Sequence, residues 1–334
     1  MSVNNSLILA LNCGSSSLKF GAYRAGECLF EGEAEEIKDY NLAFTQALDK
    51  LSAQGLKDFW RIGHRVVHGG PSLRNHFILT DDTFAKLQAA VDFAPLHLPA
   101  SLAVIAAVSQ KMPDHPQVIC LDTAFHRSMP DVAKTYALPA AVRQLGVERF
   151  GFHGLSLESI LHQLDPVPAN LVIAHLGNGS SITAIKNGQS IDTSMGLTPT
   201  GGVIMGTRTG DLDPGLMIFL SRHGFANPDE LEVLVDRKSG LLGVSGISND
   251  VRHIPPDDLS LRMFAYQVSK TIASMAAALG GLDLLVFTGG IGEHATAVRS
   301  AIGDKLKWID SFEIRVLPAK EDLQIARIAL QIQA

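Results

Sequence analysis

Hydrophobic and polar positions follow a period that changes several times along the first third of the chain. Leu7–Leu11 is continuously apolar, which predicts a strand buried on both faces, and Leu18–Tyr23 alternates in part. A third strand is predicted at Cys28–Glu33, and apolar residues at helical spacing predict a helix near Asn41–Ala53. The pattern then predicts a strand over Trp60–His68, helices near Asp82–Ala90 and Pro99–Gln110, and a strand over Gln117–Asp122.

The same order of elements begins again in the second half. Three strands are predicted at Leu171–His175, Ser181–Ile185 and Gln189–Ser194, and Asn187-Gly188 between the last two is a strong hairpin signal. The further predicted elements are helices near Pro214–His223, Pro228–Val235 and Leu259–Leu279, a strand over Leu282–Gly290, a strand at Glu313–Leu317 and a helix at Glu321–Gln331.

This repeat predicts two duplicated α/β domains, each of βββαβαβα type. Two copies are too few for a solenoid, and 334 residues suit two domains better than one. We expect residues 1–123 with 318–334 to form the first domain, and residues 124–317 to form the second domain with most of the nucleotide site.

Composition and charge narrow the class of protein. Hydrophobic residues make up 46% of the chain and charged residues 19%, which is enough to bury two cores. A net charge of −6 without a long basic run disfavours a nucleic-acid or membrane partner. The N-terminus lacks the pattern of a secretory signal, so we expect a cytoplasmic protein. Cys13, Cys28 and Cys120 are expected to be buried, reduced thiols without a catalytic role.

Two turns rich in glycine and serine occupy equivalent places in the two halves. Gly14–Ser17 follows the first strand, and Gly177–Ser181 follows the first strand of the repeat. The alternating run after each turn predicts a hairpin, unlike the strand-to-helix turn of a P-loop. Small residues there let backbone N–H groups and hydroxyls face a phosphate, and Lys19 lies just beyond the first turn. The alternative is a plain hairpin with a solvated lysine.

Residues Asn12–Lys19, "NCGSSSLK", resemble the N-terminal signature of the acetate kinase family. The resemblance extends to Glu293 through these further blocks: "GHRVVHGG", "APLHLP", "CLDTAFHRSMP", "RFGFHGLS", "HLGNGSSI", "MGTRTGDLDPG", "SGLLGVSGISNDVR" and "FTGGIGE". It implies the fold of sugar kinases, Hsp70 chaperones and actin (ribonuclease H-like), with two duplicated domains and an interdomain cleft, in agreement with the repeat.

The resemblance also implies a chemistry. A phosphotransferase that makes an acyl phosphate from ATP needs little acid–base catalysis, because a carboxylic acid is already ionised at pH 7. Its difficulty is the repulsion between the carboxylate and the phosphates, so positioned cations are expected. The resemblance implies Asp122, His153 and Arg208 as catalytic residues, and Arg65, Val67, Leu96, Phe152 and Pro199 as the acyl-substrate site.

Structural roles are the alternatives for these side chains: a salt bridge for each arginine, a core position for each histidine and a helix cap for Asp122. His64, His68 and His97 are left unassigned. The four apolar pocket residues would leave little room, which favours a two-carbon acid.

The resemblance implies a nucleotide site and a metal site. Residues assigned to ATP are Lys19, Ser15, Ser17, His175, Leu176, Gly177, Asn178, Gly179, Asp250, Val251, Arg252, Gly290, Ile291, Gly292, Glu293 and His294. Asn12 and Glu321 match the Mg²⁺ positions, and a few oxygen ligands completed by phosphates and water suit that ion. Ala319-Lys320 departs from the family's usual residues before this glutamate.

Three functions stay open at this point. The first is an acetate kinase that uses Mg²⁺ and ATP, which the family further implies to be a homodimer. The second is a propionate or butyrate kinase, separated from the first by the side chain at Val67 and the size of the pocket. The third is a regulatory module that closes on a nucleotide without catalysis, against which Arg65, Asp122, His153 and Arg208 together argue.

Overall fold

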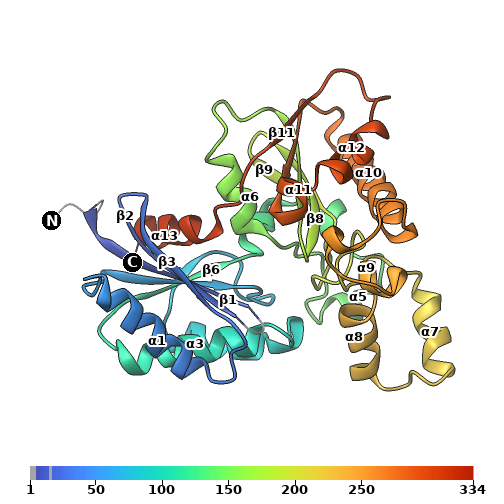
Figure 1. The fold of residues 1–334 in the computed structure, drawn as a ribbon. Coiled ribbons are helices and arrows are strands. Elements are labelled where there is room, and N and C mark those ends of the chain that lie inside the picture. The colour runs from blue at the N-terminus through green and yellow to red at the C-terminus, as the bar shows by residue number, and fades with distance from the viewer. Residues whose placement is uncertain (1–4, 15–16, 334) are drawn as a thin grey trace. The chain divides into compact units, whose positions relative to one another are not determined.

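The computed structural model describes residues 5–14 and 17–333, which fold into two compact units (Figure 1). The N-terminal unit takes the described residues of 1–127, 154–159 and 320–334, and the central unit takes 128–153 and 160–319. The division expected from the sequence differs at its ends and in the segment 154–159, which was expected in the second domain.

Among its described residues, the N-terminal unit holds a six-stranded sheet in the order β3-β2-β1-β4-β6-β5. The strands are β1 (Leu7–Cys13), β2 (Leu18–Arg24), β3 (Glu27–Ala34), β4 (Arg61–Val66), β5 (Phe77–Ile78) and β6 (Gln117–Leu121). The helices are α1 (Tyr40–Ala53), α2 (Asp81–Ala89), α3 (Leu98–Lys111) and α13 (Glu321–Gln331), with 3₁₀ turns η2 (Val91–Phe93) and η3 (Ala124–Ser128).

Both faces of this sheet are buried at β1, which explains the unbroken apolar run of that strand. Leu9 and Leu11 point to the face covered by α1 and α3, whereas Ile8 and Ala10 point to the face covered by α13. Figure 1 shows α13 on the side of the blue strands opposite α1 and α3. A strand buried between two helical layers cannot alternate apolar and polar residues.

The central unit has a five-stranded sheet in its described part, in the order β11-β10-β7-β8-β9. Its strands are β7 (Asn170–Leu176), β8 (Ser180–Lys186), β9 (Gln189–Thr193), β10 (Leu284–Thr288) and β11 (Glu313–Val316). The helices are α4 (Asp131–Lys134), α5 (Ala140–Arg143), α7 (Pro214–Arg222), α8 (Pro228–Arg237), α9 (Gly240–Ser245), α10 (Leu259–Leu279), α11 (Gly289–His294) and α12 (Thr296–Asp304), with the 3₁₀ turn η4 (Val251–His253); α6 (Gly154–Leu161) spans the boundary of the units.

The two sheets share one strand order, which confirms the predicted duplication. When the short β5 is left out and the strands are numbered from the first of each unit, both sheets read 3-2-1-4-5, with strands 1 to 3 antiparallel and strands 4 and 5 parallel to strand 1. The N-terminal unit adds β5 at the edge beyond β6.

Helix α10 supplies most of the apolar cover of the central sheet. Phe264, Val268 and Ile272 are fully buried against β7 and β8. The helix begins at Asp258, whose carboxylate accepts from the N–H of Ser260, and ends at Gly280 in the left-handed conformation. These are the standard start and stop signals of a helix, which is why the pattern alone located it.

Two expectations from the sequence were wrong. Cys28 is exposed rather than buried, because β3 is the edge strand of its sheet and most of its side chains face solvent; Cys13 and Cys120 are buried as expected. The predicted strand Leu282–Gly290 spans only Leu284–Thr288, because Gly289 adopts φ +76° and begins the helix α11.

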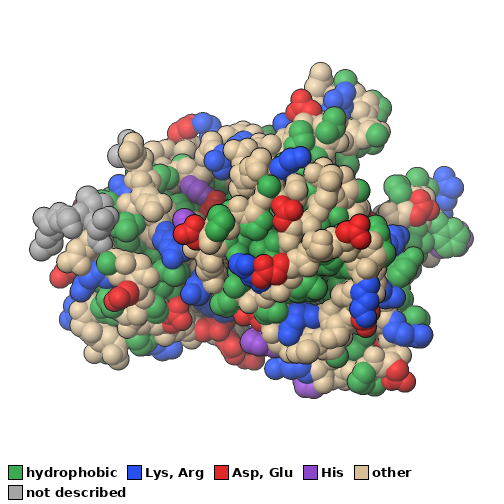
Figure 2. All heavy atoms as spheres, turned by 90° about the horizontal axis from the view of Figure 1, so that it is seen from above, with side chains coloured by type: hydrophobic (Ala, Val, Ile, Leu, Met, Phe, Trp, Pro, Cys, Tyr) green, Lys and Arg blue, Asp and Glu red, His purple; other side chains and the backbone are tan. Residues whose placement is uncertain are grey.

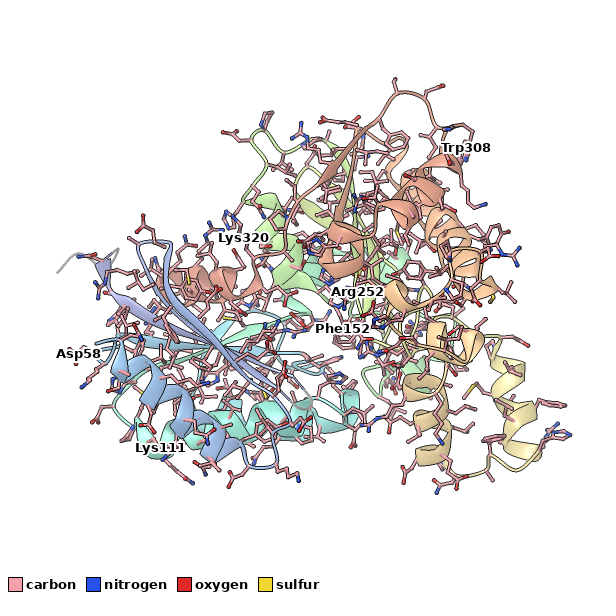
Figure 3. All side chains as sticks on the ribbon, in the orientation of Figure 1. Asp58, Lys111, Phe152, Arg252, Trp308 and Lys320 are labelled. Atoms are coloured by element: carbon pink, nitrogen blue, oxygen red, sulfur yellow. The ribbon has the colours of Figure 1, made fainter. Side chains whose placement is uncertain are left out.

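The surface carries both signs of charge. On the face drawn in Figure 2, acidic and basic side chains are interspersed rather than segregated. Figure 3 marks Lys320, the N-cap residue of α13, and Trp308, whose ring is largely exposed after α12. Over residues 5–14 and 17–333, the helices are all too short or too polar to cross a bilayer.

Candidate active site

Both turns rich in glycine and serine are hairpin turns, as the sequence predicts. In the N-terminal unit Cys13 pairs with Leu18 across the turn, and the Gly14 N–H donates to the Ser17 carbonyl at 2.8 Å. In the central unit Leu176 pairs with Ser180, and the Gly177 N–H donates to the Gly179 carbonyl at 3.0 Å. Ser15, assigned to ATP by the resemblance, lies outside the described residues.

An ion pair lies at the carboxyl ends of β4 and β6, two neighbouring parallel strands. Arg65 Nε and Nη2 both donate to Asp122 Oδ2, at 2.9 and 2.6 Å. Asp122 is only 1% exposed, and its second oxygen, Oδ1, is buried without a partner in the described part of the chain. An orphaned, buried carboxylate oxygen marks a place where a ligand is expected.

Asn12 and Asp322 extend this network. Arg65 Nη1 donates to Asn12 Oδ1 at 3.0 Å, and Asn12 Nδ2 donates to Asp322 Oδ1 at 2.8 Å. Asn12 sits near the end of β1 and Asp322 in the first turn of α13. Four elements of the N-terminal unit therefore meet at one polar cluster, which we call the carboxylate cluster: Asn12, Arg65, Asp122, Glu321 and Asp322.

Burial and charge act against each other in the carboxylate cluster. Burial alone lowers the pKa of Arg65, but the carboxylates of Asp122 and Glu321 outweigh it, so the pKa is raised and the guanidinium stays charged. Burial raises the pKa of Asp122, although Arg65 opposes the rise. Burial also raises the pKa of Asp322, with the Asn12 hydrogen bond opposing and Glu321 adding to the rise.

Lys19 faces the same cluster from outside. Its side chain on β2 is exposed, and its ammonium lowers the pKa of Asp322 in opposition to burial. The strand register pairs Lys19 with Asn12. Lys19 therefore adds a cation beside the carboxylates of the N-terminal unit.

The three unassigned histidines have structural settings. His64 is buried, which lowers the pKa of its imidazole to about 3, so the ring is neutral in the core. His68 Nδ1 accepts from the Gly70 N–H at 2.8 Å and its ring packs on Phe93. His97 lies at the start of α3.

His153 and His175 stack on each other in the central unit. Their ring centroids are 4.1 Å apart, and His153 Nδ1 lies 3.0 Å from the Ser181 hydroxyl, which follows the second hairpin turn. His153 adopts φ +60°, a conformation that costs a non-glycine residue about 1–3 kcal/mol. Local strain of this kind gathers at functional sites, where surrounding contacts fix a side chain in place.

Arg208 and His153 converge on the second hairpin turn. A Cβ added at Gly179 would lie 3.3 Å from both Arg208 Nη1 and His153 Nε2, tighter than ordinary contact. Glycine therefore lets two cationic or polar side chains approach the backbone of the turn closely. Arg208 Nη1 also donates to the Pro199 carbonyl at 3.4 Å and Met205 Sδ lies 3.8 Å away, so its loop is held from two sides.

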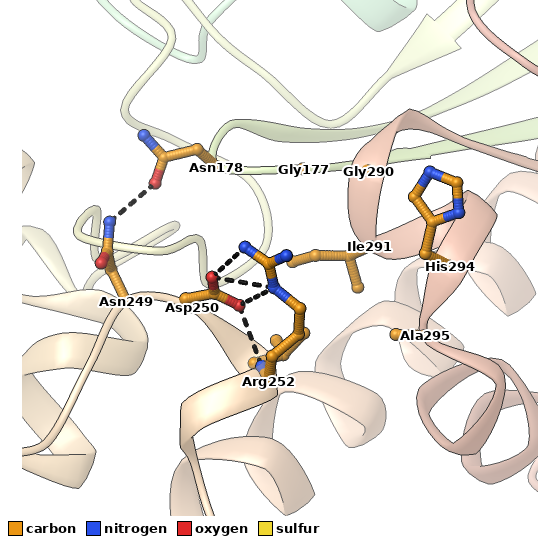
Figure 4. Close-up of a pocket in the computed structure, with 10 residues that line it drawn as sticks. Gly177, Asn178, Asn249, Asp250, Arg252, Gly290, Ile291, His294 and Ala295 are labelled. Carbon is orange, nitrogen blue, oxygen red and sulfur yellow. Dashed lines mark hydrogen bonds and ion pairs between the residues drawn. The ribbon is translucent and has the colours of Figure 1, made fainter.

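A cavity of about 520 Å³ opens beside the same turn (Figure 4). Its wall is formed by Gly177, Asn178, Asn249, Asp250, Val251, Arg252, Gly290, Ile291, His294 and Ala295. Arg252 forms a two-point ion pair with Asp250, with contacts of 2.6 to 3.0 Å, and this pairing lowers the pKa of the Asp250 carboxyl. Asn249 Nδ2 donates to Asn178 Oδ1 at 3.3 Å.

Most of the nucleotide residues predicted in the central unit line the cavity or lie close to its wall, whereas Lys19 and Ser17 belong to the N-terminal unit. Gly177, Asn178, Asp250, Val251, Arg252, Gly290, Ile291 and His294 line the cavity. Leu176 and Gly292 are buried beneath it, and Glu293 Oε1 accepts from the backbone N–H groups of Gly289 and Ala319. Sequence reasoning missed Asn249, although it stands in the block "SGLLGVSGISNDVR", and Ala295, which carries no motif signal beyond lying next to a predicted residue.

The residues assigned to the acyl substrate come from both units. Val67 is buried and Leu96 half-buried in the N-terminal unit, beyond β4 and before α3. Phe152 is fully buried in the central unit, one residue before His153, and Pro199 is half-buried there. In sequence, Val67 lies two residues after Arg65 and Phe152 directly before His153.

The donor set of the N-terminal unit fits Mg²⁺ in part. The orphaned Oδ1 of Asp122 and the nearby Glu321 are hard oxygen donors of the kind that Mg²⁺ prefers, and this ion keeps most of its shell as water and phosphate. Asn12 is engaged through both amide atoms, its oxygen with Arg65 and its nitrogen with Asp322. Three or more His, Cys, Asp or Glu side chains in metal-binding geometry do not occur among the residues that the structure describes.

Comparison with known proteins gives consistent results. A family model described as the acetokinase family matches residues 29–321. Acetate kinase 1 of Neisseria meningitidis serogroup A is 40% identical over 341 residues, spanning 90% of this chain and 86% of its own length. Propionate kinase PduW of Salmonella typhimurium is 39% identical over 345 residues, spanning 90% and 85%.

Comparison with solved structures leads to the same family. The crystal structure of a propionate kinase from Francisella tularensis is 34% identical with a TM-score of 0.92, covering 98% of this chain and all of its own. An acetate kinase and propionate kinases are thus similar to this chain to nearly the same degree.

Proposed function

The chain belongs to the acetokinase family, and from that premise we propose that it transfers the terminal phosphoryl group of ATP directly to the carboxylate of acetate. The products are acetyl phosphate and ADP. The observation that carries the proposal is the convergence of Arg208 and His153 on the turn of the second hairpin, beside the cavity assigned to the nucleotide. Two polar side chains held against a turn that faces phosphate are what an in-line transfer between anions requires.

Arg65 and Arg208 serve the two oxyanions. A guanidinium presents a planar fork that matches a carboxylate or the equatorial oxygens of a transferring phosphoryl group. We assign the substrate carboxylate to Arg65, which Asp122 and Asn12 fix from behind, and the transferring group to Arg208. Since both cations are set in advance, little reorganisation is needed as charge moves.

His153 is assigned a hydrogen bond to the transferring phosphoryl group. The contact of Nδ1 with Ser181 and the stack on His175 fix the plane of the ring. The other nitrogen, Nε2, is the atom that approaches Gly179 and is therefore the one assigned to the phosphoryl oxygens. No proton transfer to the acid is needed, because the attacking carboxylate is already ionised.

Asp122 Oδ1 and Glu321 are the groups that would hold Mg²⁺, which supplies charge neutralisation of the phosphates when it is bound. Asp122 Oδ2 remains committed to Arg65, so a single carboxylate would join the cation of the substrate site to the metal site. Lys19 and the first hairpin turn are assigned to the phosphates on the same side.

The cavity of the central unit is assigned to the adenosine part of ATP. Ile291 and the aliphatic stem of Arg252 supply apolar contact, while Gly177 and Gly290 allow close approach to backbone (Figure 4). The ion pair with Asp250 holds Arg252 at the wall, so its guanidinium is positioned before the nucleotide binds.

Propionate is the second candidate substrate. It is favoured by the propionate kinases among the similar proteins, which match this chain about as well as the acetate kinase does. Acetate is preferred because the residues assigned to the acyl group are bulky and apolar, and Val67 and Phe152 are buried.

Trapping of the acyl phosphate with hydroxylamine tests the proposal. The protein is incubated with Mg-ATP and acetate, propionate or butyrate in parallel, and the hydroxamate is measured. The highest kcat/KM with acetate is expected. A higher value with propionate or butyrate would favour a propionate or butyrate kinase. If none of the acids gives a hydroxamate, the function that remains is the regulatory module that binds a nucleotide without catalysis.

A homodimer, which the family resemblance implies, completes the proposal together with the cytoplasmic location expected above. Light scattering of the purified protein measures the mass directly, and a mass of one chain would contradict the dimer.

A further inference from the structure

His76 lies directly behind the carboxylate cluster and belongs to no motif. It precedes β5, which pairs antiparallel with β6 so that Phe77 faces Ile119. His76 Nδ1 therefore reaches the end of β6 and accepts from the Leu121 N–H at 3.1 Å. Because a backbone N–H can only donate, this contact requires a bare Nδ1 and assigns the ring proton to Nε2.

The protonated nitrogen of His76 faces Glu158. Nε2 lies 3.3 Å from Glu158 Oε1, and Glu158 Oε2 accepts from Gln324 Nε2 at 3.0 Å. The His76 and Glu158 side chains are only 17% and 18% exposed, and Gln324 is buried. A chain of hydrogen bonds thus joins β6, α6 and α13 inside the N-terminal unit.

Strand β6 and helix α13 lead into or carry residues of the proposed site, and α6 is tied to them. Leu121 is followed by Asp122, and Gln324 stands one turn or less after Glu321 and Asp322. Helix α6 is tied to the same place at its start, where the Gly154 N–H donates to the Asp122 carbonyl at 2.9 Å. A Cβ at Gly154 would collide with that carbonyl, so the approach is as close as backbone allows.

We propose that His76 is a positioning residue, which acts through Leu121 and Glu158 to hold Asp122 and the first turn of α13 in register for phosphoryl transfer. The inference rests on the proposed function. Arg65 holds Oδ2 of Asp122, but Oδ1 has no partner in the described chain, so the backbone on either side also determines where Oδ1 lies. A displacement near 1 Å at such a group costs about 10²-fold in rate.

Two conservative variants separate the two hydrogen bonds of His76, one to Leu121 and one to Glu158. In H76N the amide oxygen can still accept from Leu121, but the side chain is too short for Glu158. In H76Q the amide nitrogen can still donate to Glu158, but the acceptor for Leu121 is lost. H76N and H76Q are each expected to keep part of the activity that is lost in H76A, which removes both hydrogen bonds.

The expected result for H76A is a fall in kcat of about 10- to 10²-fold, an increased requirement for Mg²⁺ and an unchanged KM for ATP. The KM for ATP stays because the cavity assigned to adenosine lies in the central unit and Lys19 on β2 is not joined to His76 by these hydrogen bonds. H115A is the matched control, since His115 is a half-buried histidine of the same unit outside the proposed site. Its kcat should equal that of the parent protein.

The hydrogen-bonding pattern is checked without catalysis. Long-range ¹H–¹⁵N correlation of the intact protein should show His76 with a bare Nδ1 and a protonated Nε2, and E158Q should perturb only the Nε2 signal. The opposite ring form would overturn the proposal. So would an H76A protein that is less stable towards urea but keeps the parent kcat, because that is a purely structural role. A parent protein that forms no acyl phosphate would overturn the proposed function itself.

Discussion

The two units present their proposed catalytic groups in different ways. In the N-terminal unit the carboxylate cluster contains a chain of contacts that runs from Asp122 through Arg65 and Asn12 to Asp322. In the central unit His153 and Arg208 are brought against a glycine turn by ring stacking, a hydroxyl contact and backbone strain. In the N-terminal unit, charged side chains are held by groups of opposite charge. In the central unit, the side chains are held by packing.

The difference teaches where stability and activity are coupled. A buried charge that loses its partner is costly to the fold, whereas a side chain held by packing against a turn can change with less effect on the fold. Substitutions in the carboxylate cluster should therefore affect folding and turnover together. Substitutions around the second hairpin should affect turnover alone.

The largest effect is expected for Arg65→Met. It leaves the Asp122 carboxylate buried without its cation, which should lower the free energy of unfolding by about 3–5 kcal/mol, measured by urea denaturation. Arg315→Met is the control, because its ion pair with Glu313 is exposed and screened. Equal unfolding midpoints for the two variants would contradict the coupling of stability and turnover in the N-terminal unit.

Arg208→Lys should reduce kcat by about 10²- to 10³-fold without changing the unfolding curve. Lysine keeps the charge but replaces a fork by a point contact, and the loss of one preorganised contact has this magnitude. Steady-state kinetics measure it, with Arg222→Lys on the exposed side of α7 as the control. Near-normal turnover would place Arg208 outside the chemistry.

Lys19→Ala tests whether stability and turnover are coupled only at buried positions of the N-terminal unit, because Lys19 belongs to this unit but is exposed. Loss of one charged contact to phosphate should lower kcat/KM for Mg-ATP by about 10- to 10²-fold and leave stability unchanged. Lys38→Ala provides an exposed lysine of the same unit for comparison. If the kinetics of Lys19→Ala match the parent protein, the first turn is only a hairpin.

Val67→Ala should shift the preference from acetate towards propionate by about 10-fold. The change opens space for about one methylene, which is worth roughly 1–3 kcal/mol in discrimination between neighbouring homologues. The measurement is the ratio of kcat/KM for the two acids, with Val132→Ala at an exposed position as the control. A constant ratio would mean that Val67 does not line the acyl pocket.

The smallest effect is expected from Asp322→Asn, as a dependence of stability on pH. Burial raises the pKa of folded Asp322, so its favourable contribution is complete below the unfolded pKa and is lost as pH rises. The advantage of the parent protein over the variant in free energy of unfolding should therefore decrease as the pH rises above about 4, the ordinary pKa of an unfolded aspartate. Asp310→Asn, at an exposed position, should show no such trend, and an advantage that grows with pH would contradict the argument.

Much of the fold could be predicted from the sequence, because periodic patterns carry it. The continuous apolar run of β1 and the capped helix α10 were located from pattern alone. Helix α11 was missed because Gly289–Gly292 has little helical propensity and is helical only through the contacts of its surroundings. The short β5 has too few residues to show a period.

The candidate site could be predicted only where a motif marks it. Asp122 and Arg208 stand in blocks of the family resemblance, while their assigned roles stay predictions. Asp322 and His76 have no such signal, because their contacts join segments far apart in the chain: Asp322 bonds Asn12, and His76 bonds Leu121 and Glu158. Only the folded arrangement brings such partners together.

Helix α13 has a consequence for how the protein is made. It covers the face of the first sheet formed by Ile8, Ala10 and Cys120, yet it is built from residues 321–331. During translation that face has no cover until the whole intervening length has left the ribosome. The N-terminal unit is thus the first to be synthesised and the last to complete its fold. A nascent chain cut short before residue 321 carries an uncovered apolar sheet that chaperones and proteases can recognise.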